Sequence, residues 1–290
     1  GSICGTDLHF YRGEWTKIKT GQVIGHDACG TRADTGEKVA MIPTIYCGSC
    51  YFCLRGQPHL CENGKFMGID KDGLFAEYIA MPTKNLVPIP KNVSNEEAAI
   101  LEPAALAIDT LEFLRPRLSD WVAIIGQGPI GLLMTQVAKL KGCLVIAIDL
   151  HDYRLNLSKK YGADICINAN EEDPANKVKQ ITKRGSDIVV EAAGTKQTVE
   201  QAPFLVRSAG KVALIGESAG YLDLGNVGEA LFSTVYVTPI HYSLALNLIS
   251  QKILDVKGLI THRFKLVDFE RAIKTAGNFA ERPVKVVITT

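Results

Sequence analysis

The sequence predicts an α/β protein of about two domains, in which an irregular, mostly β region precedes a doubly wound parallel sheet. A length of 290 residues fits two domains. The first hundred residues are rich in Gly, Pro and Cys, and from Trp121 compact apolar runs alternate with amphipathic helical segments. Strands that alternate with helices favour a parallel sheet built by right-handed crossovers.

In the N-terminal region, short alternating runs at 75–80 and 85–90 predict strands set among functional loops. Near Glu96 the character changes. Residues 105–114 have helical spacing, and Pro116 ends that pattern.

The second region carries the alternation that defines the parallel sheet. We predict strands at 121–125, 144–148, 187–191 and 211–215, with helices at 130–141, 175–183 and 198–206. After residue 240 we predict helices at 242–251 and 268–277 and a strand at 284–289. Residues 121–138 lack charge, but three glycines and a proline in that run indicate a strand, a turn and a helix start, not a membrane span.

Composition and charge narrow the classes of partner and compartment. The chain is 47% hydrophobic and 22% charged, with a formal net charge of +1 and no long basic run. This argues against nucleic acid or an anionic membrane as a partner, and against a small zinc module that reads nucleic acid. Four of the eight cysteines cluster at metal spacing and no signal peptide is visible, so we expect a cytoplasmic protein.

Four cysteines lie within fifteen residues, at Cys47, Cys50, Cys53 and Cys61. Thiolates at this spacing can converge on one tetrahedral ion, which is how structural zinc is held. Four ordinary cysteines are the plain alternative, and an iron–sulfur cluster is a second. The late Cys61, followed by Glu62 in place of a proline, favours zinc.

A glycine-rich turn follows the first predicted strand of the parallel sheet and opens a predicted helix. Its residues are Gly126, Gly128, Pro129, Ile130 and Gly131. Such a turn lets the backbone approach a pyrophosphate at a helix N-terminus, although a turn without a ligand remains an alternative. Asp149 ends the next strand, where a carboxylate would bind ribose hydroxyls and favour NAD over NADP. Arg154 keeps NADP open.

Cys4, His26 and Glu102 are the candidates for a second, reactive metal site. Taken singly, Cys4 and His26 are compatible with ordinary core residues, and Glu102 before Pro103 is compatible with a helix cap. Together, a thiol, an imidazole and a carboxylate are compatible with a reactive metal site.

With these motifs together, the sequence resembles the zinc-containing medium-chain dehydrogenase/reductase family, and within it most the sorbitol (polyol) dehydrogenase branch. The resemblance runs from Ile3 to the C-terminus. The motifs that show the resemblance are residues 4–7, Gly25-His26, the four-cysteine segment, residues 73–78, Glu102-Pro103, the glycine turn and residues 259–264.

The resemblance implies a GroES-like catalytic domain, N-terminally shortened here, beside a Rossmann domain. The implied limits are 1–104 for the catalytic domain with its zinc lobe at 46–62, 105–240 for the NAD-binding domain, and 241–290 for a return to the catalytic domain. It further implies two zinc ions per chain, NAD, and a homodimer or homotetramer.

The family resemblance also assigns roles to site residues. Cys4, His26 and Glu102 match the ligands of the catalytic zinc. Thr6 matches a hydroxyl that begins a proton relay, and Asp7 a carboxylate that orients the ligand histidine. His9 matches the outer end of the relay or is a surface histidine.

Asp27 stands where the family usually has Glu, and a side chain one methylene shorter leaves open whether it reaches the metal. The implied reaction is hydride transfer between NAD and a secondary alcohol of a polyol or sugar. The alternatives are a threonine or simple alcohol dehydrogenase, and a non-catalytic zinc-stapled scaffold that binds a dinucleotide.

Overall fold

The structure is a computed structural model that describes residues 1–15, 18–216, 230–233 (backbone only) and 237–290. The chain forms two compact units, one made of Gly1–Ala105 with Tyr236–Thr290 and the other of Leu106–Val235. The domain boundaries predicted from the sequence, after residue 104 and after residue 240, stay predictions.

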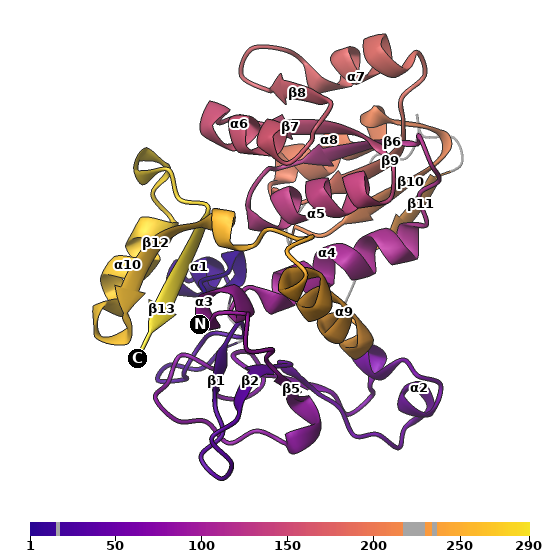
Figure 1. Cartoon of the computed structure of the whole chain (residues 1–290). Coiled ribbons are helices and arrows are strands. Elements are labelled where there is room, and N and C mark those ends of the chain that lie inside the picture. Colours follow the sequence, from indigo (N-terminus) through magenta and orange to yellow (C-terminus); the bar gives the residue numbers. More distant parts are fainter. Residues whose placement is uncertain (16–17, 217–229, 234–236) are drawn as a thin grey trace. The chain divides into compact units, whose positions relative to one another are not determined.

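The described residues of the second unit form one six-stranded sheet (Figure 1). Its strands are β6 (Trp121–Ile125), β7 (Leu144–Asp149), β8 (Ile165–Asn168), β9 (Ser186–Glu191), β10 (Val206–Leu214) and β11 (Ala230–Ser233). The spatial order is β11-β10-β9-β6-β7-β8, and every neighbouring pair is parallel. Successive strands are added first on one side of β6 and then on the other, which confirms the predicted doubly wound sheet.

Four helices connect strands β6 to β10 in turn: α5 (Pro129–Leu140), α6 (Asp152–Lys160), α7 (Pro174–Thr182) and α8 (Lys196–Leu205). Helix α4 (Leu101–Leu114) precedes β6 and spans the limit between the units. Helices α5 and α6 pack on each other, as do α7 and α8. The sequence pattern missed β8 and α6, because β8 has only four residues and α6 is largely polar, with few buried side chains.

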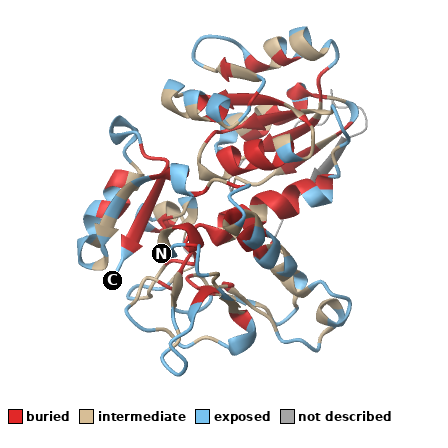
Figure 2. Cartoon of the chain, in the orientation of Figure 1, coloured by how far each residue is buried: buried red, intermediate tan, exposed pale blue. Residues whose placement is uncertain are grey.

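The core of this unit follows the two-residue period of its strands. Ile146 and Ile148 on β7 point to the same face as Val189 on β9, and this face packs against Val178 of α7 and Ala202 of α8. Figure 2 shows β6, β7 and β9 buried along almost their whole length. Strands covered on both faces read as continuous apolar runs, which is why four of them were visible in the sequence.

In the first unit, the part of the chain that the structure describes forms three small sheets. An antiparallel sheet has the order β1 (Cys29–Thr31), β2 (Lys38–Met41), β5 (Leu86–Pro88); β3 (Thr44–Ile45) pairs with β4 (Lys65–Phe66), and β12 (Ile260–Lys265) runs parallel to β13 (Lys285–Thr289). Its α-helices are α1 (Gly5–Tyr11), α2 (Tyr51–Leu54), α3 (Asn95–Ala98), α9 (Pro239–Ser250) and α10 (Phe269–Ala276). Short 3-10 turns lie at Pro58–Leu60, Thr83–Asn85, Lys257–Leu259, Leu266–Asp268 and Phe279–Glu281.

The prediction of a strand at 75–80 was wrong, whereas 85–90 contains β5. Backbone pairing is confined to the start of this segment and the residues before it: the amides of Gly73 and Phe75 donate to the carbonyls of Val23 and Ile24, at 2.7 and 3.1 Å. Beyond Phe75 the chain leaves this partner, and Tyr78 is 86% exposed. Alternating side chains alone therefore did not make a strand, because a strand also needs a neighbouring backbone to pair with.

The start of the chain lies against its last strand. Ser2 forms an antiparallel bridge with Val287, and the amide of Ile3 donates to the carbonyl of Val286 at 2.9 Å. Ile3 and Val286 share an apolar cluster with Ile273 of α10. This packing fixes the backbone immediately before Cys4, the first of the predicted metal ligands.

Within the part of the chain that the structure describes, no helix is long and apolar enough to cross a membrane.

Candidate functional site

The four predicted thiol ligands converge near the protein surface. The sulfur atoms of Cys47, Cys50, Cys53 and Cys61 all lie within 4.8 Å of one another. Cys61 Sγ is 3.5 Å from Cys47 Sγ and 3.8 Å from Cys50 Sγ. Helix α2 begins directly after Cys50, and the turn at Pro58–Leu60 returns the chain so that Cys61 meets the first pair.

Backbone amides surround one of these sulfurs. The N–H groups of Ser49 and Cys50 donate to Cys47 Sγ at 3.4 and 3.3 Å, and these bonds lower the pKa of Cys47 to about 5. Desolvation and the neighbouring thiols raise the pKa of Cys53 to about 12. Four sulfurs at this spacing can surround one cation, which would bind them as thiolates, so the donor set fits a structural zinc ion.

A second donor group is buried in the same unit. Cys4, His26 and Asp27 each offer one atom, and these atoms lie within 4.8 Å of one another. His26 and Asp27 are almost fully buried, and His26 Nε2 is 3.8 Å from Asp27 Oδ1. Asp27 Oδ1 is buried without a hydrogen-bond partner. A thiol, an imidazole and a carboxylate with an orphaned oxygen fit a zinc ion that keeps an open position.

Local structure explains how Cys4 and His26 are held. Cys4 is the N-cap of α1, and its amide donates to Asp7 Oδ2 at 2.8 Å. Gly25 has φ +94°, and a Cβ atom there would lie 2.5 Å from the ring of Phe75. Only glycine can therefore precede His26 in this backbone conformation.

Asp7 is close enough to influence His26 electrostatically. Burial alone would lower the pKa of His26, but the charges of Asp27, Cys4 and Asp7 outweigh it and raise that pKa well above its usual value. Burial raises the pKa of Asp7 itself. The predicted role of Asp7 in orienting His26 stays a prediction, since the hydrogen bond that Asp7 accepts comes from Cys4.

Glu102 lies in the first turn of α4, beside Asp27. Desolvation and the adjacent charge of Asp27 raise the pKa of Glu102 to about 7. Asp27 is the carboxylate whose oxygen lies within 4.8 Å of the Cys4 and His26 donor atoms. Glu102 is a second carboxylate next to Asp27. The choice between Glu102 and Asp27 as third ligand stays open.

A buried lysine that sequence reasoning missed completes this centre. Lys285 is 2% exposed, and its Nζ donates to Asp27 Oδ2 and to the carbonyl of Ile3, both at 3.0 Å. Burial would lower the pKa of Lys285, but Asp27, Cys4 and Glu102 outweigh it and raise that pKa. A lone lysine inside the apolar C-terminal strand was the available signal, because a buried charge needs a partner.

Thr6 and His9 follow Cys4 on α1. Thr6 Oγ1 is 3.8 Å from Cys4 Sγ, which places a hydroxyl next to the donor group. His9 is partly exposed and pairs with Glu14. Their predicted roles in a proton relay stay predictions.

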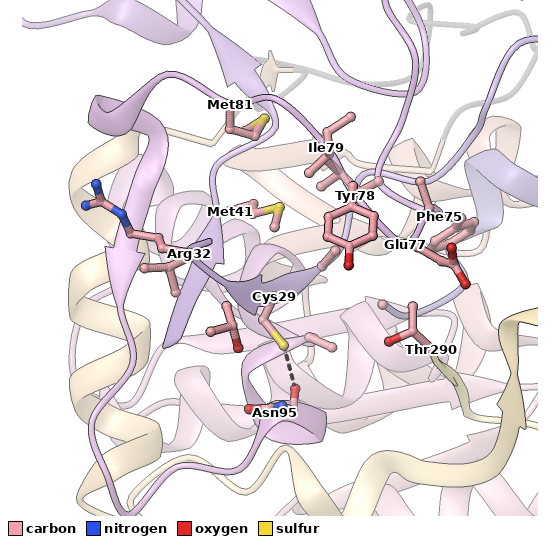
Figure 3. Close-up of a pocket in the computed structure, with 18 of the residues that line it drawn as sticks. Cys29, Arg32, Met41, Phe75, Glu77, Tyr78, Ile79, Met81, Asn95 and Thr290 are labelled. Atoms are coloured by element: carbon pink, nitrogen blue, oxygen red, sulfur yellow. Dashed lines mark hydrogen bonds between the residues drawn. The ribbon is translucent and has the colours of Figure 1, made fainter. Parts of the chain in front are cut away.

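A pocket of about 720 Å³ in the same unit lies apart from these donors. Figure 3 shows its lining, with Met41, Ile79 and Met81 along it and Cys29 Sγ bonded to the carbonyl of Asn95. Cys4, His26 and Glu102 are not among its lining residues. Its size is that of a ligand site, but it lacks the cluster of metal-binding side chains that distinguishes the group of Cys4, His26 and Asp27.

In the second unit, the glycine turn connects β6 to α5. Gly126 has φ +90°, and a Cβ on Gly131 would lie 1.9 Å from the carbonyl oxygen of Gly126. Gly128 is the N-cap of α5 and Pro129 its first residue. The turn therefore places a glycine backbone at a helix N-terminus, as pyrophosphate binding requires.

Asp149 lies at the end of β7, as predicted, and is bonded to this turn. Its Oδ2 accepts from the amide of Gln127 at 2.7 Å, and its Oδ1 from the amide of His151 at 2.9 Å. Arg154 Nη1 is 3.8 Å from Asp149 Oδ2. The structure thus brings the acidic and the basic candidate for ribose recognition to the same turn.

Metal-donor groups in one unit and a dinucleotide-type turn in a doubly wound sheet define a zinc-type dehydrogenase. Sequence comparison agrees: residues 129–244 match the "Zinc-binding dehydrogenase" family and residues 1–91 the "Alcohol dehydrogenase GroES-like domain". The chain belongs to this zinc-binding dehydrogenase family. The predicted family and its fold class are thereby confirmed, and the polyol branch stays a prediction.

Individual relatives support the family assignment. The chain is 39% identical to L-threonine 3-dehydrogenase of Pyrococcus furiosus, over 94% of this chain and 84% of the relative. An Escherichia coli structure, described as a short chain alcohol dehydrogenase complexed with NADH, is 30% identical with a TM-score of 0.90, over 100% and 89% of the two chains. Galactitol-1-phosphate dehydrogenase from Escherichia coli is 27% identical with a TM-score of 0.87, over 100% and 90%.

Proposed function

We propose that this protein is a zinc-dependent dehydrogenase that transfers hydride between a secondary alcohol and NAD. The observation that carries the proposal is the meeting of Cys4, His26 and Asp27, with Glu102 beside them, in a chain that also has a dinucleotide-type turn. Bound zinc would supply a Lewis acid for the substrate oxygen, and the dinucleotide would accept the hydride.

The residues of the chain take separate roles in this proposal. Cys4 and His26 hold the ion together with Glu102 or Asp27, and Lys285 balances the carboxylates. The Thr6 hydroxyl takes the proton from the substrate hydroxyl and passes it outward to His9. The four cysteines at 47–61 hold a second, structural ion, which makes two zinc ions per chain.

NAD is the preferred dinucleotide in this proposal. The Asp149 carboxylate faces the turn, where it would accept hydrogen bonds from ribose hydroxyls and repel a 2′-phosphate. Arg154 lies 3.8 Å away and offsets part of that repulsion. The ratio of kcat/KM for NAD and NADP tests this preference.

The substrate proposed first is L-threonine, whose β-carbon bears a secondary hydroxyl. Relatives named L-threonine 3-dehydrogenase are 32–39% identical to this chain over at least 93% of its length. A polyol or sugar alcohol is the second candidate, supported by Glu102-Pro103 in the sequence and by the similarity to galactitol-1-phosphate dehydrogenase. Both carry the same reacting group, so side chains around the site decide between them.

The test combines metal analysis with a substrate panel. We expect two zinc ions per chain and reduction of NAD, followed by absorbance, with L-threonine at a higher kcat/KM than with sorbitol, xylitol or ethanol. A higher value for a polyol would favour the second candidate. One zinc per chain and no turnover of any member, despite NAD binding, would identify a non-catalytic scaffold.

The subunit number and the cellular compartment are also part of this proposal. We expect a homodimer or homotetramer in the cytoplasm, and light scattering of the purified protein measures the number of subunits.

A further inference from the structure

The segment after α1 folds back onto the helix and brings a carboxylate to His9. Gly13 has φ +69°, which ends the helix and reverses the chain. The amide of Glu14 then donates to the carbonyl of His9 at 3.0 Å. In the same turn, Glu14 Oε2 lies 2.5 Å from His9 Nδ1.

Two further contacts restrain this pair. The His9 ring stacks on the ring of Trp15, with centroids 4.8 Å apart and planes inclined by only 7°. Arg12 Nη1 is 3.9 Å from the other carboxylate oxygen of Glu14. An ordinary surface ion pair has neither a stacked ring nor a backbone tie, and its side chains are free to separate.

The position of His9 on α1 connects this pair to the donor group. His9 follows Thr6 by three residues, so the two side chains share one face of the helix. The Thr6 hydroxyl lies 3.8 Å from Cys4 Sγ. In the proposed function, a proton that leaves the substrate hydroxyl by way of Thr6 would travel along this face of α1 to His9, which is partly open to solvent.

We infer that Glu14 is a positioning residue for proton release: it fixes the His9 tautomer and stabilises the charge that His9 acquires during turnover. This inference rests on the proposed function. An ionised carboxylate only accepts hydrogen bonds, so its contact places a hydrogen on Nδ1 and leaves Nε2 as the basic nitrogen. One proton enters at Nε2, the imidazolium is balanced by Glu14, and one proton leaves to solvent water, so the pair ends unchanged.

The experiment measures tautomer and turnover in the zinc-loaded protein. The ¹⁵N shifts of labelled histidine report the His9 tautomer, with a His9→Gln variant to assign its signals among the six histidines. We expect the Nδ1–H form in the parent protein and a mixture in Glu14→Ala. In Glu14→Ala, kcat should fall about tenfold with KM unchanged, the usual scale for removing a group that orients a functional histidine.

Two further variants test whether a loss of kcat in Glu14→Ala comes from the lost carboxylate charge or from the removal of any surface glutamate. Glu14→Gln keeps a hydrogen-bonding group of the same size without the charge, and because an amide can donate as well as accept, it should give a mixture of tautomers and lose part of kcat. Glu172→Ala is the matched control, an exposed glutamate that pairs with Lys177 at 2.5 Å in the second unit, and it should equal the parent.

The outcomes distinguish this inference from the proposed function. An unchanged tautomer in Glu14→Ala, or a changed tautomer with unchanged kcat, overturns the role of Glu14 and leaves the dehydrogenase proposal standing. If the parent protein oxidises no alcohol, the dehydrogenase proposal fails and the role of Glu14 in proton release fails with it.

Discussion

The two candidate metal centres of this protein are built in opposite ways. The thiols of Cys47, Cys50, Cys53 and Cys61 come from fifteen consecutive residues and lie at or near the surface. The second centre joins Cys4, His26 and Asp27 in the interior, with a lysine from the other end of the chain beside them. A site assembled from one short segment depends on local turns, whereas a site assembled from distant segments depends on the whole fold of its unit.

The two centres also balance charge differently. At the surface, amides and solvent stabilise thiolates such as Cys47. In the interior, solvent is excluded, and the acidic groups face the buried ammonium of Lys285. Burying a charge without a partner is costly, so the interior centre tolerates fewer changes. Loss of a ligand should therefore distinguish the two centres by function and stability, and changes of charge should distinguish them by their electrostatics.

The largest effect is expected from Cys4→Ser. Loss of this ligand should remove one of two zinc ions and lower kcat by roughly a thousandfold or more, since Lewis-acid stabilisation supplies several kcal/mol. NAD binding should persist, because the glycine turn lies in the other unit. Zinc analysis, steady-state kinetics and calorimetric NAD titration measure these quantities. Cys166→Ser, a thiol outside both centres, is the control, and full activity of Cys4→Ser refutes the ligand assignment.

Cys50→Ser should lower stability and leave activity nearly unchanged, the opposite of Cys4→Ser. It should also remove one zinc ion and lower the melting temperature by roughly 10 °C, corresponding to about 3–4 kcal/mol. At 25 °C, kcat should stay within about threefold of the parent value, because distant sites act nearly independently. Calorimetry, limited proteolysis at 46–62 and kinetics test this. A collapse of kcat with no change in melting temperature would reverse the roles assigned to the two centres.

Lys285→Met tests the charge balance of the interior. Removing one partner of a buried ion pair leaves Asp27 uncompensated and should lower the free energy of unfolding by about 3 kcal/mol. The matched control is Arg263→Met, because Arg263 pairs with Glu96 at 2.8 Å near the surface. That variant should lose less than about 1 kcal/mol. Denaturant unfolding of both variants decides, and equal losses would show that burial of the lysine is unimportant.

The smallest effect is expected in thiol labelling of the zinc-free protein. At pH 7, Cys47 should react with iodoacetamide only a few-fold faster than an ordinary thiol, because a thiolate of lower pKa is also a weaker nucleophile. Its rate should hold between pH 7 and pH 6, since its pKa of about 5 keeps it ionised, whereas a thiol of ordinary pKa slows about tenfold. Mass spectrometry after timed quenching measures the rates. A tenfold slowing at Cys47 would contradict the role of the Ser49 and Cys50 amides.

Much of the second unit could be predicted from the sequence. β6 has the predicted bounds, and α5, α7 and β9 lie within one residue of theirs. The features that define them are local: apolar runs of strand length, helical periodicity, and glycines at a tight turn. The four-residue β8, the polar α6 and β12 were missed, since their patterns are short or weak.

By itself, the sequence determined the parallel sheet, the glycine turn with Asp149 and the four-thiol centre, because each depends on neighbours within one or two elements of the chain. Only the tertiary structure decided that 75–80 lacks a strand partner, that Asp27 stands closest to Cys4 and His26, and that Lys285 reaches Asp27 across 258 residues. The physical reason is that burial and pairing between distant segments leave no periodic trace. They arise only when the packed chain excludes water and brings opposite charges together.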